Sequence, residues 1–426
     1  MALSRADARS LDAQDPLAPF RSRFIEQPDD VIAYLDGNSL GRPLKAIDQT
    51  WNTLATQVWS QRLIRGWTDD ADGGNWLELP EIVGDELAAA ALGAAAGQTV
   101  IADSTTVNFY KAMRAAVNLR PGRKKIIVDR ENFPTNRYIA ESVASDLGLE
   151  LVWLRPDLAT GVSADDVAAV LDDDVAVVTL SHIAYRSGFL ADMSAITALA
   201  HRHGALVVWD LCHSVGSFPI TLDADDVDFA VGCTYKFVGA GPGAPAFSYV
   251  NRRHHADLNQ PIWGWLGRAD SFEMEQGYRP AAGIRSMISG TPQIPGILAV
   301  REGARVIGEA GIDTIRAKAV RLGEMVISLV DEWLGPQGYR LGSPRDSDQR
   351  GAHVSILRHD ARQLNDALIG AGVIGDFRAP DAIRLGLSPL ANSYEEVWSA
   401  LEVIRDLDRA EYPGQDRPAE YFDRAE

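Results

Sequence analysis

The chain has 426 residues, of which 46% are hydrophobic and 23% are charged, as is typical of a globular protein with two or three domains. Its 41 basic and 59 acidic residues give a net charge of −18 (41 − 59), and the sequence pI is about 4.9. This balance argues against nucleic acid or an anionic membrane as the main partner.

The two cysteines, Cys212 and Cys233, are too few for a disulfide framework or a zinc ribbon, so we expect a reducing cytoplasmic location. The N-terminal segment is polar and lacks the apolar core of a secretory signal, and no apolar run is long enough to span a bilayer. We therefore expect neither a leader peptide nor a membrane span.

The middle of the chain alternates between short apolar runs and helical patterns. The runs are rich in Val and Ile and end in polar or glycine-containing turns, which is typical of buried strands. A helix is predicted over 163–171 and another over 192–203, where Gly204 follows as a C-terminal cap. Alternating strands and helices predict an α/β domain with a mostly parallel sheet covered on both faces. The predicted strands are 99–103, 124–129, 149–154, 175–180, 205–210, 227–232 and 245–250.

The two ends of the chain have a different pattern. A short strand is predicted over 31–35, a long helical pattern runs from about 293 to 335, and a terminal helix spans 394–409. Strands over 353–357 and 382–387 enclose another helix. We therefore expect a large domain over 50–292 and a smaller α+β domain formed by 1–49 and 293–426.

An aspartate and a lysine follow two consecutive predicted strands. Asp210 ends the run 205–210, and Lys236 stands just past the end of the run 227–232. In an α/β sheet both residues face the crevice where ligands bind. Pyridoxal phosphate (PLP) needs this pair, because a lysine forms the Schiff base with its aldehyde and an aspartate keeps its ring nitrogen protonated. The competing interpretations are an aspartate that caps a helix or binds magnesium and a lysine in a solvated loop.

A phosphate site is predicted between the strand 99–103 and a helical run that begins at Val107. Ser104, Thr105 and Thr106 lie at this junction, where hydroxyl and backbone N–H groups at a helix N-terminus bind anions. Taken alone, these residues are more simply interpreted as an ordinary Ser/Thr helix cap. The sequence has no P-loop, no dinucleotide fingerprint and no HExxH motif, so we predict no metal site.

Seven motifs resemble those of the kynureninase family, in that family's order and over roughly residues 30 to 390. Kynureninases are homodimeric PLP enzymes of fold type I, the class-V aminotransferase type. They hydrolyse the Cβ–Cγ bond of kynurenine or 3-hydroxykynurenine and release alanine and an anthranilate. The motifs are 34–41 (YLDGNSLG), 133–136 (FPTN), 210–214 (DLCHS), 234–236 (TYK), 241–247 (GPGAPAF), 264–267 (GWLG) and 289–292 (SGTP).

The resemblance implies a role for each matching residue. Lys236 would form the Schiff base, Asp210 would hold the ring nitrogen, and Tyr235 would donate the proton to Cβ. A substrate α-amino acid would bind through its carboxylate to Arg384, beside Asn38 and Ser39, since arginine bonds carboxylates bidentately. Trp265 and Thr291 would reach the cofactor from the second subunit of a homodimer. The cofactor-binding set is then Thr105, Thr106, Phe133, Asn136, Ser181, Asp210, His213, Tyr235, Lys236, Trp265 and Thr291.

The sequence departs from the family at three polar positions. The family usually has Asp where Asn136 stands, Asn where Gly239 stands, and Asn where Ala184 stands. Losing hydrogen-bonding groups from a substrate pocket predicts weak turnover of kynurenine itself. The alternative is a divergent PLP enzyme of antibiotic metabolism that catalyses β-elimination, C–S cleavage or decarboxylation-coupled deamination of a cysteine conjugate. A non-catalytic PLP-binding scaffold is a third possibility, which the complete lysine, aspartate and phosphate set disfavours.

Overall fold

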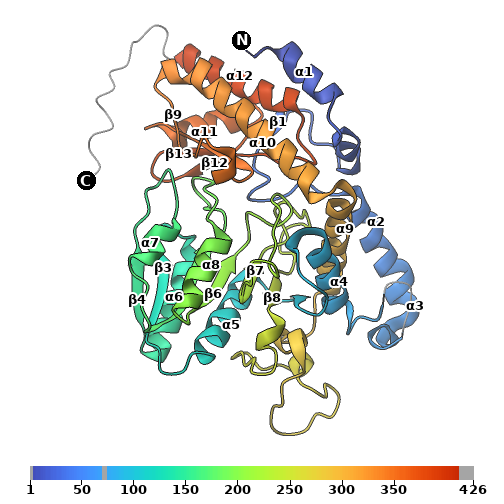
Figure 1. The fold of residues 1–426 in the computed structure, drawn as a ribbon. Coiled ribbons are helices and arrows are strands. Elements are labelled where there is room, and N and C mark those ends of the chain that lie inside the picture. Colours follow the sequence, from blue (N-terminus) through green and yellow to red (C-terminus); the bar gives the residue numbers. More distant parts are fainter. Residues whose placement is uncertain (1–2, 70–73, 412–426) are drawn as a thin grey trace.

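The computed structural model describes residues 3–69 and 74–411. It consists of two parts, each built from sheets and helices, which lie one above the other in Figure 1. The lower part is built on a seven-stranded sheet with the order β2-β8-β7-β6-β5-β3-β4. Strands β7, β6, β5, β3 and β4 run parallel, whereas β8 is antiparallel to both β7 and β2. The strands are β2 (Thr99–Ile101), β3 (Lys125–Asp129), β4 (Glu150–Leu154), β5 (Val175–Ser181), β6 (Leu206–Asp210), β7 (Phe229–Gly232) and β8 (Phe247–Val250).

Both faces of this sheet are buried, as the continuous apolar strands predict. Along β6, Val207 and Trp209 belong to one hydrophobic cluster while Leu206 and Val208 belong to another, because successive side chains point to opposite faces. The helices that flank the sheet are α4 (Leu79–Leu87), α5 (Thr105–Asn118), α6 (Pro134–Leu147), α7 (Ala164–Ala168) and α8 (Met193–Arg202). The mostly parallel α/β sheet predicted from the sequence is therefore confirmed.

The upper part contains a four-stranded antiparallel sheet with the order β12-β13-β10-β9. A second small sheet pairs β1 (Ala33–Tyr34) in parallel with β11 (Val373–Ile374), which joins the start of the chain to its end. The strands of the larger sheet are β9 (Arg340–Leu341), β10 (His353–Leu357), β12 (Asp376–Arg378) and β13 (Ala382–Gly386). The remaining helices are α1 (Arg5–Ala13), α2 (Lys45–Thr53), α3 (Ser60–Arg62), α9 (Ile294–Ala310), α10 (Ile312–Leu329), α11 (Ala361–Gly370) and α12 (Tyr394–Glu411).

The helical pattern predicted from 293 to 335 is interrupted at Gly311, which has a φ of 77° and separates α9 from α10. Apolar residues of α9 belong to the same cluster as the large sheet, whereas those of α10 from Leu322 onward belong to the cluster of the small sheets. The division at residue 293 stays a prediction, and these clusters favour a boundary further along, within α10.

The seven-stranded sheet sets the position of the site. Four parallel strands, β3, β5, β6 and β7, carry polar residues at or just past their carboxyl ends, and these ends meet at one edge of the sheet. Within the described ranges, no helix is long and apolar enough to cross a membrane.

Candidate active site

Asp210 ends β6 and is held from three sides. Its Oδ2 accepts hydrogen bonds from Asn136 Nδ2 at 2.7 Å and from Ser181 Oγ at 3.2 Å, while its Oδ1 accepts from the backbone N–H of Cys212 at 2.8 Å. Ser181 stands directly opposite Asp210 in the register of β5 and β6. A carboxylate offers about four lone-pair sites, so roughly one remains for a ligand. The structure thus brings together Asp210, Asn136 and Ser181, as the sequence predicts.

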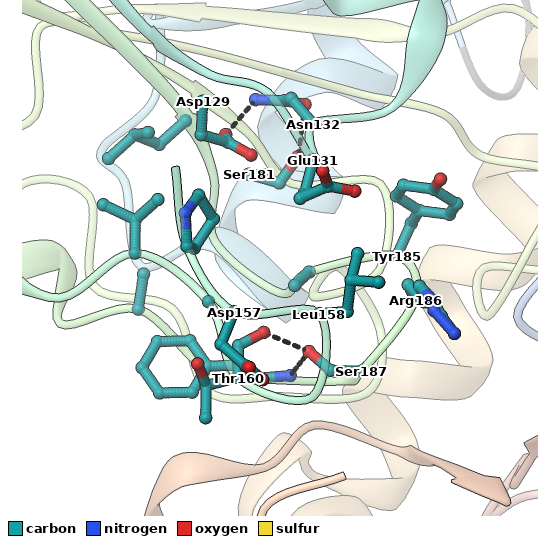
Figure 2. Close-up of a pocket in the computed structure, with 17 residues that line it drawn as sticks. Asp129, Glu131, Asn132, Asp157, Leu158, Thr160, Ser181, Tyr185, Arg186 and Ser187 are labelled. Carbon is teal, nitrogen blue, oxygen red and sulfur yellow. Dashed lines mark hydrogen bonds between the residues drawn. The ribbon is translucent and has the colours of Figure 1, made fainter. Parts of the chain in front are cut away.

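A second polar layer lies behind these residues. Asn132 Oδ1 accepts from Asn136 Nδ2 at 3.0 Å and also lies 3.0 Å from Ser181 Oγ, whose single hydroxyl hydrogen is shared between this oxygen and Asp210 Oδ2. Asn132 Nδ2 donates to Asp129 Oδ2 at 2.9 Å. Asp129 is buried at the end of β3, and this burial raises its pKa to about 7. Figure 2 shows Asp129, Asn132 and Ser181 on one side of a cavity at the ends of β3, β4 and β5, with Tyr185 further along its wall.

Sequence reasoning did not identify Asn132 or Asp129 as site residues. Asp129 did carry a usable signal, because it ends an apolar run in the same way as Asp210. Asn132 had no such signal, because it lies in the turn between β3 and α6, outside any repeating pattern.

Lys236 lies in the loop after β7, and its Nζ is 3.0 Å from Nε2 of His213. The same ring nitrogen lies 3.1 Å from the backbone oxygen of Asn38. Burial, followed by the nearby charges of Lys236 and Arg384, holds the pKa of His213 well below its usual range. A neutral imidazole therefore lies beside the lysine amine.

The segment that contains Asn38 packs directly against the lysine loop. The Gly41 N–H donates to the Tyr235 backbone oxygen at 2.7 Å, and a Cβ atom at position 41 would lie 2.1 Å from the Lys236 backbone oxygen. Glycine at position 41 is therefore required by the close approach of the two backbones. This contact explains how a motif near the N-terminus reaches the site.

Tyr235 is half-buried, and its pKa is raised by burial and by the neighbouring Cys233. Its phenol therefore carries a proton over the ordinary pH range and can donate it. Cys233 also contacts Cys212, since the Cys233 N–H lies 3.3 Å from the Cys212 sulfur.

Thr105 and Thr106 are in the first turn of α5, which begins two residues earlier than the sequence predicts. Ser104 is the N-cap, with its Oγ 3.4 Å from the Val107 backbone nitrogen. First-turn N–H groups have no acceptor within their own helix, so this end of α5 is suited to an anion. Below it, the buried Lys111 ammonium lies 2.6 Å from Asp103 Oδ2 and joins α5 to the backbone of Met287.

Phe133, Trp265 and Thr291 are each at least partly exposed to solvent. The Phe133 ring is 40% exposed and meets the ring of Tyr185 edge-on, with 5.6 Å between centroids. Trp265 packs edge-on against Phe272 at 5.9 Å, and Thr291 is exposed at a surface cavity. No contact with Lys236 is found for Trp265 or Thr291 among the described residues of this chain.

Arg384, on β13, is 1% exposed and has acidic and carbonyl partners from the chain itself. Its Nε donates to Asp376 Oδ1 at 2.8 Å, and its Nη2 donates to Asp376 Oδ2 and, at 2.9 Å, to Ser39 Oγ. Its Nη1 donates to the Tyr185 backbone oxygen. Sequence reasoning missed Asp376, because the strand β12 that carries it is too short to produce an alternating pattern.

Known proteins resemble this chain over nearly its full length. Residues 315–404 match the family model described as the kynureninase C-terminal domain, and residues 84–252 match the DegT/DnrJ/EryC1/StrS aminotransferase family. A kynureninase from Deinococcus radiodurans is 41% identical over 97% of this chain and 98% of its own length. A kynureninase from Pseudomonas fluorescens is 38% identical over 95% of each.

The solved structures that resemble this fold are more distant in sequence. An apo cysteine desulfurase from Thermococcus onnurineus has a TM-score of 0.76 at 18% identity, covering 96% of this chain and 100% of its own. A cystine C–S lyase variant with glycine linked to its PLP cofactor has a TM-score of 0.74 at 17% identity, covering 88% and 96%. The fold is thus that of the PLP-dependent enzymes of fold type I. By its full-length similarity, the chain belongs to the kynureninase family.

Proposed function

We propose that this protein is a PLP-dependent hydrolase that cleaves the Cβ–Cγ bond of kynurenine or a closely related β-acyl amino acid. The observation that carries the proposal is that Lys236 and Asp210 lie at one sheet edge, in a chain related over nearly its full length to kynureninases. The reaction adds water to the side-chain carbonyl carbon, breaks the Cβ–Cγ bond and places a proton on Cβ. The products are alanine and an aromatic carboxylic acid.

The residues present fit the cofactor. Lys236 supplies an amine for its aldehyde, Asp210 retains one acceptor site for its ring nitrogen, and the first turn of α5 offers N–H groups for its phosphate. The exposed Phe133 ring is available for stacking on the cofactor. When bound, PLP would supply an electron sink for the bonds broken at the substrate α and β carbons.

The protein groups would then bind the substrate and move protons. Lys236 Nζ would take the proton from the α carbon, and His213, whose Nε2 lies 3.0 Å from Nζ, would hold the amine in position. Tyr235 Oη would donate the proton to Cβ, since burial keeps the phenol protonated. Asp210, held by Asn136 and Ser181, would maintain a negative charge at the ring nitrogen.

The substrate carboxylate would bind between the seven-stranded sheet and the four-stranded sheet that carries Arg384. Arg384 supplies the positive charge, and Ser39 bonds the same guanidinium. The side-chain amide of Asn38 is fully buried and has no hydrogen-bond partner among the described residues. Because a buried amide without partners is costly, a ligand that bonds Asn38 would gain affinity.

The alternative of a cysteine-conjugate lyase is not favoured. The desulfurases and lyases that share the fold are 17–18% identical to this chain, which supports the fold alone. The kynureninases that resemble it are 36–41% identical over nearly its full length. The changes at Asn136 and Gly239 also have local explanations, since Asn136 bonds Asp210 and residue 239 has a φ of 72°, which glycine adopts without strain.

The experiment that tests this function offers L-kynurenine and 3-hydroxykynurenine to the PLP-loaded protein and measures alanine and the anthranilate. Equal amounts of the two products are expected. S-conjugated cysteines are the matched comparison, with pyruvate and aldehydes as readouts. Turnover of the cysteine conjugates without turnover of either kynurenine would overturn the proposal and restore the alternative.

We further propose a homodimer with shared active sites, located in the cytoplasm. Trp59, Leu63 and Ile64 are 60%, 60% and 76% exposed, and they line a cavity of about 420 Å³ together with Thr291. An exposed apolar patch of this kind favours an interface between subunits. The free cysteines Cys212 and Cys233 fit a reducing compartment, and cell fractionation tests that location.

A complementation experiment tests the shared sites. Subunits with Lys236→Ala and subunits with Trp265→Ala are each expected to be inactive as pure dimers. After mixing, about half of the dimers are hybrids, and each hybrid has one intact site if Trp265 acts across the interface. Recovery of about a quarter of the wild-type activity is expected, and no recovery in proven hybrids would contradict shared sites.

A further inference from the structure

Asp376 and Arg384 form a bonded unit at the place where the substrate carboxylate is proposed to bind. Asp376 lies on β12 and Arg384 on the neighbouring strand β13, directly opposite each other in the antiparallel register. Both oxygens of Asp376 take part, one bonding Nε at 2.8 Å and the other bonding Nη2. The guanidinium is thus held along one side in a bidentate pair.

The donors of Arg384 can be counted. A guanidinium has five N–H groups, of which two go to Asp376, one to Ser39 Oγ and one to the Tyr185 backbone oxygen. One N–H on Nη1 is left without a partner among the described residues. Arg384 in this orientation therefore presents a single, fixed hydrogen-bond donor, whereas the sequence led us to expect a free bidentate fork.

Asp376 is bonded by three side chains. Its Oδ2 accepts from Arg384 Nη2, from Arg378 Nη2 and, at 2.9 Å, from Ser39 Oγ, while its Oδ1 accepts from Arg384 Nε at 2.8 Å. A carboxylate bonded in this way is a fixed support, because moving it would break four charge-assisted or hydroxyl bonds at once. It is poorly suited to leave the arginine when a substrate arrives.

We propose that Asp376 is a positioning residue that makes the site selective for a carboxylate over a neutral group. It locks the guanidinium so that the remaining Nη1 donor meets the α-carboxylate of the amino acid. Without Asp376 the guanidinium can rotate toward other acceptors, and part of the substrate affinity is spent on reorienting it. This inference rests on the proposed function, since it assigns a partner to the proposed carboxylate site.

The test compares L-alanine, the expected product, with L-alaninamide, which lacks the carboxylate charge. Binding of each to the PLP-loaded protein is followed by the absorbance of the bound cofactor. For Asp376→Asn we expect the preference for L-alanine over L-alaninamide to fall about tenfold or more, because the guanidinium loses its bidentate partner and no longer holds Nη1 toward the ligand. Loss of the negative charge of Asp376 by itself would act in the opposite direction, so the sign of the change isolates the positioning effect. In steady-state turnover of L-kynurenine, KM should rise more than kcat falls.

Asp331→Asn is the matched control. Asp331 is also bonded bidentately by an arginine, Arg345, at 2.7 and 2.8 Å, but this pair is exposed on the surface. The control variant should keep the wild-type preference. If Asp376→Asn does not fold, Ser39→Ala removes the hydroxyl that links Asp376 to Arg384 without removing a charge. It should shift the same preference in the same direction by a smaller factor.

The variant Arg384→Lys distinguishes the proposed carboxylate site at Arg384 from the proposed positioning role of Asp376. If Arg384→Lys weakens L-alanine binding while Asp376→Asn keeps the wild-type preference, the positioning role of Asp376 is wrong and the carboxylate site stands. Tighter L-alanine binding by Asp376→Asn would also overturn the inference, because it would identify Asp376 as a competitor of the substrate. If neither the wild-type protein nor Arg384→Lys discriminates L-alanine from L-alaninamide, the proposed carboxylate site and the inference are both wrong.

Discussion

The side-chain amide of Asn136 donates to Oδ2 of Asp210 at 2.7 Å, and the direction of this bond is fixed by the backbone. The Phe133 N–H must donate to Asn132 Oδ1, which it does at 2.8 Å, so that oxygen is an acceptor. Because Asn132 Oδ1 is an acceptor, the atom of Asn136 that faces it must be the amide nitrogen, Nδ2. This NH₂ group has two hydrogens and donates one to Asn132 Oδ1 and the other to Asp210 Oδ2. The amide at position 136 therefore satisfies two acceptors without any titrating proton.

The first prediction concerns position 136. We expect Asn136→Ala to weaken PLP binding about tenfold, because Asp210 loses its shortest side-chain hydrogen bond. In Asn136→Asp an added carboxylate would face Asn132 Oδ1 and Asp210 Oδ2, and only its protonated form can donate. PLP affinity of Asn136→Asp should therefore fall as pH rises, measured by equilibrium titration of the apoprotein. Asn118→Asp, on the exposed side of α5, is the control, and equal pH profiles for both variants would refute this account.

The second prediction concerns Lys236. Its Nζ lies 3.0 Å from Nε2 of His213, at the sheet edge that also carries Asp210, which is the placement expected of a Schiff-base lysine. The purified protein should be yellow, and borohydride should attach the cofactor irreversibly to the peptide that contains Lys236. Mass spectrometry of the digested protein checks the position. Attachment to another lysine, such as the buried Lys111, would contradict the assignment.

The third prediction concerns Asp210. Asp210→Asn should fold and retain PLP, but kcat should fall more than tenfold, or about 1.4 kcal/mol, because a neutral amide cannot keep the ring nitrogen protonated. Steady-state kinetics and thermal melting together separate this effect from misfolding. A smaller loss of kcat in a folded, PLP-loaded variant would show that Asp210 does not have the assigned role.

The fourth prediction concerns pH and stability. Burial raises the pKa of Asp129 from 3.8 to about 7, so the folded chain retains a proton that the unfolded chain has already lost. Below pH 3.8 the group has no effect. Between pH 3.8 and about 7 its contribution to the free energy of unfolding decreases as pH rises, and above 7 it is constant. Urea unfolding from pH 4 to 8 should show a flatter dependence for Asp129→Asn than for the wild type, and parallel curves would contradict the raised pKa.

Much of the large sheet was predictable because its strands are buried on both faces and form unbroken apolar runs. The predicted ends of the runs at Asp129, Leu154, Asp210 and Gly232 match the ends of β3, β4, β6 and β7. The placement of Lys236 and Asp210 followed directly, since the carboxyl ends of parallel strands share one edge.

Other parts of the site depend on contacts that have no local sequence signal. Asp376 lies on a three-residue strand, and its partners Ser39 and Arg384 are distant in sequence. Asn132 is selected by the geometry of a turn after β3, not by a repeating pattern. The start of α5 was placed too late, because Thr105 and Thr106 are weak helix formers that Ser104 nevertheless caps.

The guanidinium of Arg384 is bonded to Ser39, which precedes it by 345 residues, and to the backbone of Tyr185, which precedes it by 199. The strand β13 that carries Arg384 is one of the last elements to leave the ribosome. A nascent chain that ends before β13 already contains the whole seven-stranded sheet, with Asp210 and Lys236 in place. Such a chain already contains every residue proposed to hold the cofactor, but it lacks the arginine proposed to bind the amino acid. The group that would receive the substrate carboxylate is thus synthesised after the whole of the proposed cofactor site.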